Sequence, residues 1–165
     1  MAELTVLESK IGEVMGLAMA AQGATDKISK LVEEEGDQDL LQVLDRMKQE
    51  AAETEERCIE RAQELEGKKT AILEKARETK QEATEMMRTY LGPDADALDG
   101  FEFLTMAEAG EAGHWSIVEV LAQRARDAQT STLALWAKPI QEPHFEEAKE
   151  GSLKLAKAED PNATE

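Results

Sequence analysis

The stretch LTVLESKIGEVMGLAMAAQGATDKISKLVEEEG, residues 4–36, predicts the fold most directly. Its apolar side chains recur at alternating steps of three and four residues, which places them along one face of an α-helix. The stripe consists of Leu4, Leu7, Ile11, Val14, Ala18, Ala21, Thr25, Ile28 and Val32. Gly36 then ends the pattern, and Asp37 is a suitable N-cap for a following helix. We therefore expect a long helix that packs against partners along its length.

Four more helical segments are expected after this one. They cover residues 40–65, 68–91 and 101–123, and the last begins near Asp127. Only a short turn separates the first two segments, so they form an antiparallel hairpin. Pro139 and Pro143 each remove a helical hydrogen bond at a cost of about 3 kcal/mol, so we expect an irregular backbone around residues 141–142. No window has the alternation of a strand, and the predicted fold class is all-α.

The composition fits one helical domain and argues against nucleic acid as a partner. The 165 residues include only six aromatic side chains, and their net charge is −17. Binding a phosphate backbone requires clustered cations, which this chain lacks. We expect a single bundle over residues 1–158, followed by a disordered acidic tail at 159–165.

The single cysteine and the hydropathy pattern suggest a reducing, non-membrane location. Cys58 has no partner for an internal disulfide and lies on an apolar stripe, where it acts as a small buried filler. The N-terminus enters a helical pattern without a basic region and apolar run. No stretch reaches the roughly 18 apolar residues of a membrane span. The cytoplasm is therefore the expected compartment.

His114 is the histidine that the spacing places inside the bundle. It follows Phe103, Ala107 and Gly110 at steps of four, three and four, and Glu111 lies one turn before it on the same face. An acid and an imidazole at this spacing can hold a metal ion between helices. His144 lies two residues after Glu142 and after a proline, which turns it to another side of a regular helix.

Acids also border the apolar stripes of the other long helices. Carboxylates that bridge two cations, with imidazoles completing the shell, are the ligands of dinuclear iron or manganese sites in helical bundles. The expected metal ligands are Glu8, Glu50, Glu53, Glu111, His114 and Glu142. Glu108, three residues before Glu111, continues the same row of acids but is not included in this set.

Two motifs resemble those of the bacterial ferritin-like stress proteins of the YciE/YciF type. They are GKKTAILE at residues 67–74 and AEAGEAGHW at residues 107–115, and the resemblance covers roughly residues 4–157. It implies a ferritin-like antiparallel four-helix bundle with an extra connecting helix, a dinuclear metal site and a stress-related role. It matches Glu8, Glu50, His114 and Glu142 to acids and a histidine of that family's site.

Three positions depart from the pattern of that family. Met47 replaces a histidine, Gly113 replaces the acid before His114, and Pro143 follows Glu142 where another acid is common. A thioether is a poor ligand for hard iron, and glycine provides no ligand. Glu53 and Glu111 are the candidates to compensate.

Two functions therefore remain open at this level. In the first, the bundle binds iron or manganese and carries out ferroxidase-like or peroxide-scavenging redox chemistry. In the second, the metal site is lost, and the bundle acts without catalysis as a homodimer or a partner-binding module. Gly110 and Gly113 would then allow close approach of a helix.

Overall fold

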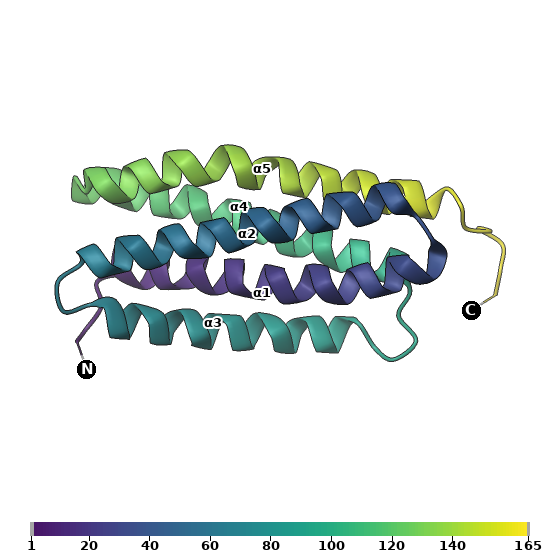
Figure 1. The fold of residues 1–165 in the computed structure, drawn as a ribbon, viewed down its shortest axis with the longest axis horizontal. Helices are drawn as coiled ribbons and strands as arrows, with labels where there is room; N and C mark the ends of the chain where they lie inside the picture. Colours follow the sequence, from purple (N-terminus) through teal and green to yellow (C-terminus); the bar gives the residue numbers. More distant parts are fainter. Residues whose placement is uncertain (1, 165) are drawn as a thin grey trace.

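The computed structural model describes residues 2–164, which form five α-helices (Figure 1). They are α1 (Val6–Glu35), α2 (Gln38–Glu64), α3 (Lys69–Tyr90), α4 (Ala97–Ala125) and α5 (Ala128–Ala156). The all-α prediction is confirmed, and α4 begins four residues before the expected Phe101. Within residues 2–164, no helix has both the length and the apolar character needed to cross a membrane.

Local sequence explains where the helices begin and end. Thr5 and Glu8 form a capping box at the start of α1, each side chain bonding the backbone of the other residue. Gly36 ends α1 in a left-handed conformation with φ of 77°, which glycine adopts at no steric cost. Asp37 and Asp127 cap α2 and α5 through their side chains, as short polar residues at this position commonly do.

Four of the helices form a closed ring in which every neighbour is antiparallel. α1 packs against α2 and α4, and α5 packs against α2 and α4. In Figure 1, α1, α3 and α5 run in one direction, and α2 and α4 run in the other. α3 lies outside this ring against α1 and α2, and carries the chain back along the bundle between α2 and α4. It therefore connects α2 to α4 along the outside of the ring.

Two glycines of α1, Gly12 and Gly16, allow α3 to pack close to α1. A Cβ added at Gly16 would lie 2.4 Å from the Ala76 carbonyl oxygen, and one added at Gly12 would lie 3.0 Å from the Ile72 carbonyl oxygen. Both glycines are buried. The backbones of α1 and α3 can approach this closely only because no side chain separates them.

The expected irregularity near residues 141–142 is wrong. α5 is continuous from Ala128 to Ala156 and contains both Pro139 and Pro143. The two prolines are four residues apart and exposed, so they lie together on the solvent-facing side of the helix. Water can hydrogen-bond the carbonyl groups that the prolines leave free, and this compensates the lost helical bonds.

The core of the bundle is divided into two apolar clusters. One surrounds Phe101, Ile28 and Leu44, near the turn between α1 and α2. The other surrounds Trp115, Ile11 and Cys58, toward the opposite end of the same helices. In α4 and α5, the buried residues that lie between these two clusters are polar or charged. This polar layer is the feature that suggests a function.

Candidate functional site

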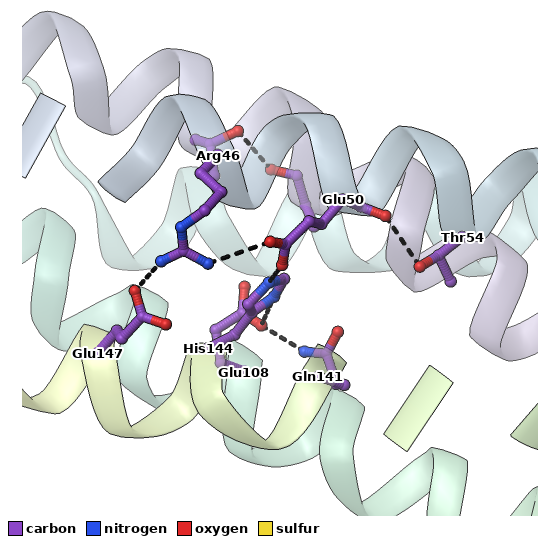
Figure 2. Close-up of polar contacts among 9 residues, drawn as sticks. Arg46, Glu50, Thr54, Glu108, Gln141, His144 and Glu147 are labelled. Atoms are coloured by element: carbon purple, nitrogen blue, oxygen red, sulfur yellow. Dashed lines mark hydrogen bonds and ion pairs between the residues drawn. The ribbon is translucent and has the colours of Figure 1, made fainter. Parts of the chain in front are cut away.

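The polar layer consists of side chains from α2, α4 and α5 that meet halfway along the bundle (Figure 2). Its members are Glu50, Glu108, Glu111, Gln141 and His144. The residues of α1 at this level include Ala18, Ala20 and Ala21, which contribute little volume and no charge. The layer is therefore acidic and is built from three of the four helices of the ring.

His144 lies between two carboxylates. Its Nε2 is 2.5 Å from Glu50 Oε2, and its Nδ1 is 3.4 Å from Glu108 Oε2. Burial by itself would lower the pKa of this imidazole, but the hydrogen bonds and negative charges of Glu108 and Glu50 outweigh burial and raise it. His144 therefore tends to hold its proton, and its charge offsets part of the negative charge of the layer.

Further contacts orient the two carboxylates that face His144. Gln141 donates its side-chain amide to Glu108, as the dashed line in Figure 2 shows. Arg46 Nη1 donates to Glu50 Oε1 at 3.2 Å, and the same guanidinium pairs with Glu147 on α5. The arginine therefore connects α2 to α5 beside the layer and holds the Glu50 carboxylate in position.

Glu111 is the member of the layer without a partner. Glu111 is only 4 % exposed. Within residues 2–164, its side chain takes part in none of the hydrogen bonds and ion pairs that connect the other members of the layer. Burial and the nearby charge of Glu108 raise the pKa of this carboxyl well above its usual range. A buried acid without a partner is costly when ionised, so it favours either a proton or a cation.

The prediction that His114 points into the bundle is wrong. Its side chain is 37 % exposed, and Nδ1 donates to the Gly110 carbonyl oxygen at 2.8 Å. The buried stripe of α4 is displaced by one position and includes Glu108, Glu111 and Trp115. The expected stripe depended on alanine and glycine, whereas the observed one buries Trp115 and Leu104, which release more apolar surface from water.

Three other expected ligands also lie away from the layer. Glu8 is held in the capping box of α1 and pairs with Lys68 at 3.2 Å. Glu53 is exposed and pairs with Arg57, and Glu142 is exposed on α5. Of the six expected residues, Glu50 contacts His144 in the layer and Glu111 is buried near the charge of Glu108, whereas the other four lie outside the layer.

Sequence reasoning left out Glu108, Gln141 and His144. The signal for the α5 residues is a stripe at steps of three and four that continues across both prolines. It contains the buried residues Leu133, Ala137, Gln141, His144, Ala148, Gly151 and Leu155. Interrupting the helix at Pro139 and Pro143 hides this register and turns His144 away from the core. A Gln-x-x-His pair on one helix resembles the Glu-x-x-His pairs of bundle metal sites, with an amide in place of one acid.

The raised pKa values of Glu111 and His144 favour the protonated forms of these two side chains. Within residues 2–164, no group of three or more His, Cys, Asp and Glu side chains already surrounds a common point at metal-binding distance. Carboxylates and an imidazole nevertheless form a suitable donor set for a divalent cation.

The metal-free protein should lose stability as the pH rises from about 6 to 8. The pKa values of His144 and Glu111 are raised in the folded state above their ordinary values of 6.5 and 4.5. Folded protein therefore binds more protons than unfolded protein in this range, and the stabilisation is lost as pH rises through the folded pKa values. We expect a loss of about 1 kcal/mol or more, measured by urea unfolding in the presence of a chelator.

The variant Glu111→Gln tests the origin of this dependence. Removing the acid should raise stability at pH 8 and reduce the slope between pH 6 and 8. Glu102→Gln, which changes an exposed acid on the same helix, is the matched control and should leave the slope unchanged. A wild-type stability that is constant or increases over this range would contradict the proposed protonation of the layer.

The contacts and burial described above are therefore the evidence for a functional role of the polar layer. Comparison of the chain with protein-family models, with curated proteins and with solved structures finds no significant match.

Proposed function

We propose that this protein is a ferritin-like bundle that binds one divalent iron or manganese ion in its polar layer. The ligands are Glu108, Glu111 and the Nδ1 atom of His144. Glu111 carries the proposal, because its residue is only 4 % exposed, its carboxyl has no hydrogen-bond or ion-pair partner among the neighbouring side chains, and a bound cation could replace the proton that its raised pKa favours.

The chain topology supports the ferritin-like part of the proposal. The four helices of the ring have antiparallel neighbours, and one long connection, which contains α3, returns the chain between α2 and α4. Four-helix bundles with one long crossover are typical of ferritin-like proteins. Their metal sites lie in the bundle core on facing helices, as this layer does.

The contacts of His144 support the assignment of its two nitrogen atoms. The contact of Nε2 with Glu50 is short, whereas Nδ1 faces Glu108 at 3.4 Å. A histidine that binds a metal commonly donates its other N–H to a carboxylate. Glu50 then has the orienting role, and Arg46 and Gln141 hold the two carboxylates in place.

The surrounding residues determine what such a centre can do. A bound iron or manganese ion would supply one-electron redox chemistry or Lewis acidity. Glu50 would fix the imidazole tautomer, and the apolar clusters around Phe101 and Trp115 would limit access of water along the bundle axis. We favour one ion over two because Glu8 is held in the capping box of α1 and Glu53 and Glu142 are exposed, so these expected ligands do not contribute to the layer.

Titration with Mn²⁺ tests this proposal. Chelator-treated protein at pH 7.5 should bind one Mn²⁺ per chain by calorimetry, and the affinity should weaken at pH 6 because protons compete for the same donors. Glu111→Gln and His144→Gln should each weaken binding at least tenfold. Glu50→Gln should weaken it about 10-fold to 100-fold as an orienting residue.

The matched controls are His114→Gln and Glu142→Gln. Each variant changes a residue that the sequence predicts as a ligand, but the side chains of His114 and Glu142 lie outside the layer. They should bind Mn²⁺ like the wild type. If these controls lose binding, or if folded wild-type protein binds neither Mn²⁺ nor Fe²⁺ stoichiometrically, the metal proposal is wrong.

A second candidate is a metal-free bundle that forms a homodimer through α4. An exposed apolar row on this helix contains Met106, Gly110, Gly113, Ile117 and Val120. A Cβ added at Gly110 or Gly113 would meet nothing within 4 Å, so the close approach that these glycines permit is not used inside the chain. A dimer mass by light scattering, together with no metal binding, would favour this second function.

A further inference from the structure

A groove opens between α1, α3 and α4, beside the polar layer. Its volume is about 470 Å³. Much of its wall is formed by small residues, including Ala20, Gly23 and Ala83. α3 is held against α1 at Gly12 and Gly16, but farther along these small side chains do not fill the space between the helices. The groove therefore follows from the helix sequences.

The groove combines an apolar wall with an acidic floor. Met19, Met87 and Phe103 contribute to the wall, and flexible methionines adapt well to apolar ligands. Glu108 and Glu111 also line the groove, and both residues are at least 96 % buried. Lys80 is exposed and His114 is half-buried, so these two residues lie toward the mouth. Pockets of this size with few polar groups are typical of small-molecule sites.

The charge of the floor indicates the polar group of the ligand. Glu108 is engaged by Gln141 and His144, whereas Glu111 has no such partner. A carboxylate on the ligand would be repelled by these acids, and an uncharged head group would supply no charge to pair with the Glu111 carboxylate. A protonated amine supplies both the opposite charge and the hydrogen-bond donors that Glu111 lacks. The net charge of −17 also attracts cations to this surface.

We propose that the groove binds a small apolar molecule with one protonated amine, which pairs with Glu111 while the apolar part lies along α1, α3 and α4. This inference does not require the metal ion. Because both ligands use the Glu111 carboxylate, Mn²⁺ and the amine should compete.

The experiment compares three probes that share one chain length: octylamine, octanol and octanoate. Each is titrated by calorimetry into folded, chelator-treated protein at pH 7.5, below the concentration at which the probe aggregates. Octylamine should bind at one site per chain and at least tenfold more tightly than octanol, and octanoate should bind most weakly. Equal binding of octylamine and octanol would overturn the proposed role of the acidic floor.

Two variants separate the floor from the wall. Glu111→Gln should remove the preference for octylamine over octanol, whereas Glu102→Gln, with the same change at an exposed site on α4, should retain it. Ala83→Phe, which fills the groove from α3, should weaken both octylamine and octanol at least tenfold. Unchanged binding in Glu111→Gln or Ala83→Phe would contradict the proposal. So would a dimer by light scattering that does not bind octylamine, because a second copy would then cover the groove.

These outcomes also separate this inference from the metal site. Protein that binds octylamine but no Mn²⁺ would support the groove and reject the metal proposal. Protein that binds Mn²⁺ but not octylamine would support the metal proposal and reject the proposed amine site in the groove. Competition between the two ligands would support both, because it requires a shared carboxylate.

Discussion

His144→Ala should destabilise the metal-free protein by about 3 kcal/mol at pH 6. The imidazole is buried between Glu50 and Glu108, and its raised pKa favours the charged form. Its removal would leave two carboxylates facing each other across a cavity without the cation that separates them. Removing one partner of a buried ion pair is costly because the remaining charge is neither solvated nor paired. Urea unfolding of chelator-treated protein measures the loss.

His114→Ala is the matched control, because it makes the same substitution at the other histidine of the chain. The His114 side chain is 37 % exposed and lies 3.7 Å from Glu13. Exposed ion pairs contribute about 0 to 1 kcal/mol, so this variant should remain close to the wild type. Equal losses for the two variants would show that the polar layer has no special role in stability.

Gly16→Ala should destabilise the protein by about 2 kcal/mol through overpacking. The new Cβ would lie 2.4 Å from the Ala76 carbonyl oxygen and 2.7 Å from Thr79 Cβ. The first contact is with backbone, so the strain can be relieved only by moving α3 away from α1. Alanine favours a helix interior over glycine by about 1 kcal/mol, and this gain offsets part of the cost. The thermal unfolding midpoint should fall accordingly.

Gly23→Ala tests the same substitution on the same helix. A Cβ at Gly23 would meet nothing within 4 Å, and the position is exposed. Only the helix propensity changes there, so the variant should be stabilised by about 0.5 to 1 kcal/mol. The two variants should therefore differ in sign. A neutral or stabilising effect of Gly16→Ala would mean that α3 can shift without loss of packing.

The sequence predicted the helices well because their signals are local. The turn at Gly36-Asp37 is specified by a left-handed glycine and a side-chain cap, and α5 begins next to Asp127 as expected. The exception is the backbone around residues 141–142. Proline rules describe the lost hydrogen bond, whereas the surrounding bundle decides whether the helix continues across it.

The site was predicted less well because side-chain orientation is not a local property. On α4, two stripes one residue apart have the same three-and-four spacing, and only packing of Trp115 and Leu104 selects the one that buries Glu111 and exposes His114. Glu50 and Glu111, which the sequence predicts as metal ligands, both lie in the polar layer, and their binding of a metal stays a prediction. His144 was assigned to the wrong side because the expected break at Pro139 and Pro143 changed its register.

The sequence by itself determined five helical segments, the turn at Gly36-Asp37 and an acidic chain without signals for strands. These properties depend on residues within a few positions of one another. The tertiary structure alone decided which histidine is buried, that Glu50, Glu108 and His144 meet, and that a groove remains beside Glu111. Those features join residues that are 33 to 94 positions apart in the chain, so they depend on how the helices are rotated and spaced relative to one another. Packing of the large side chains and the close contacts at glycines set this rotation and spacing.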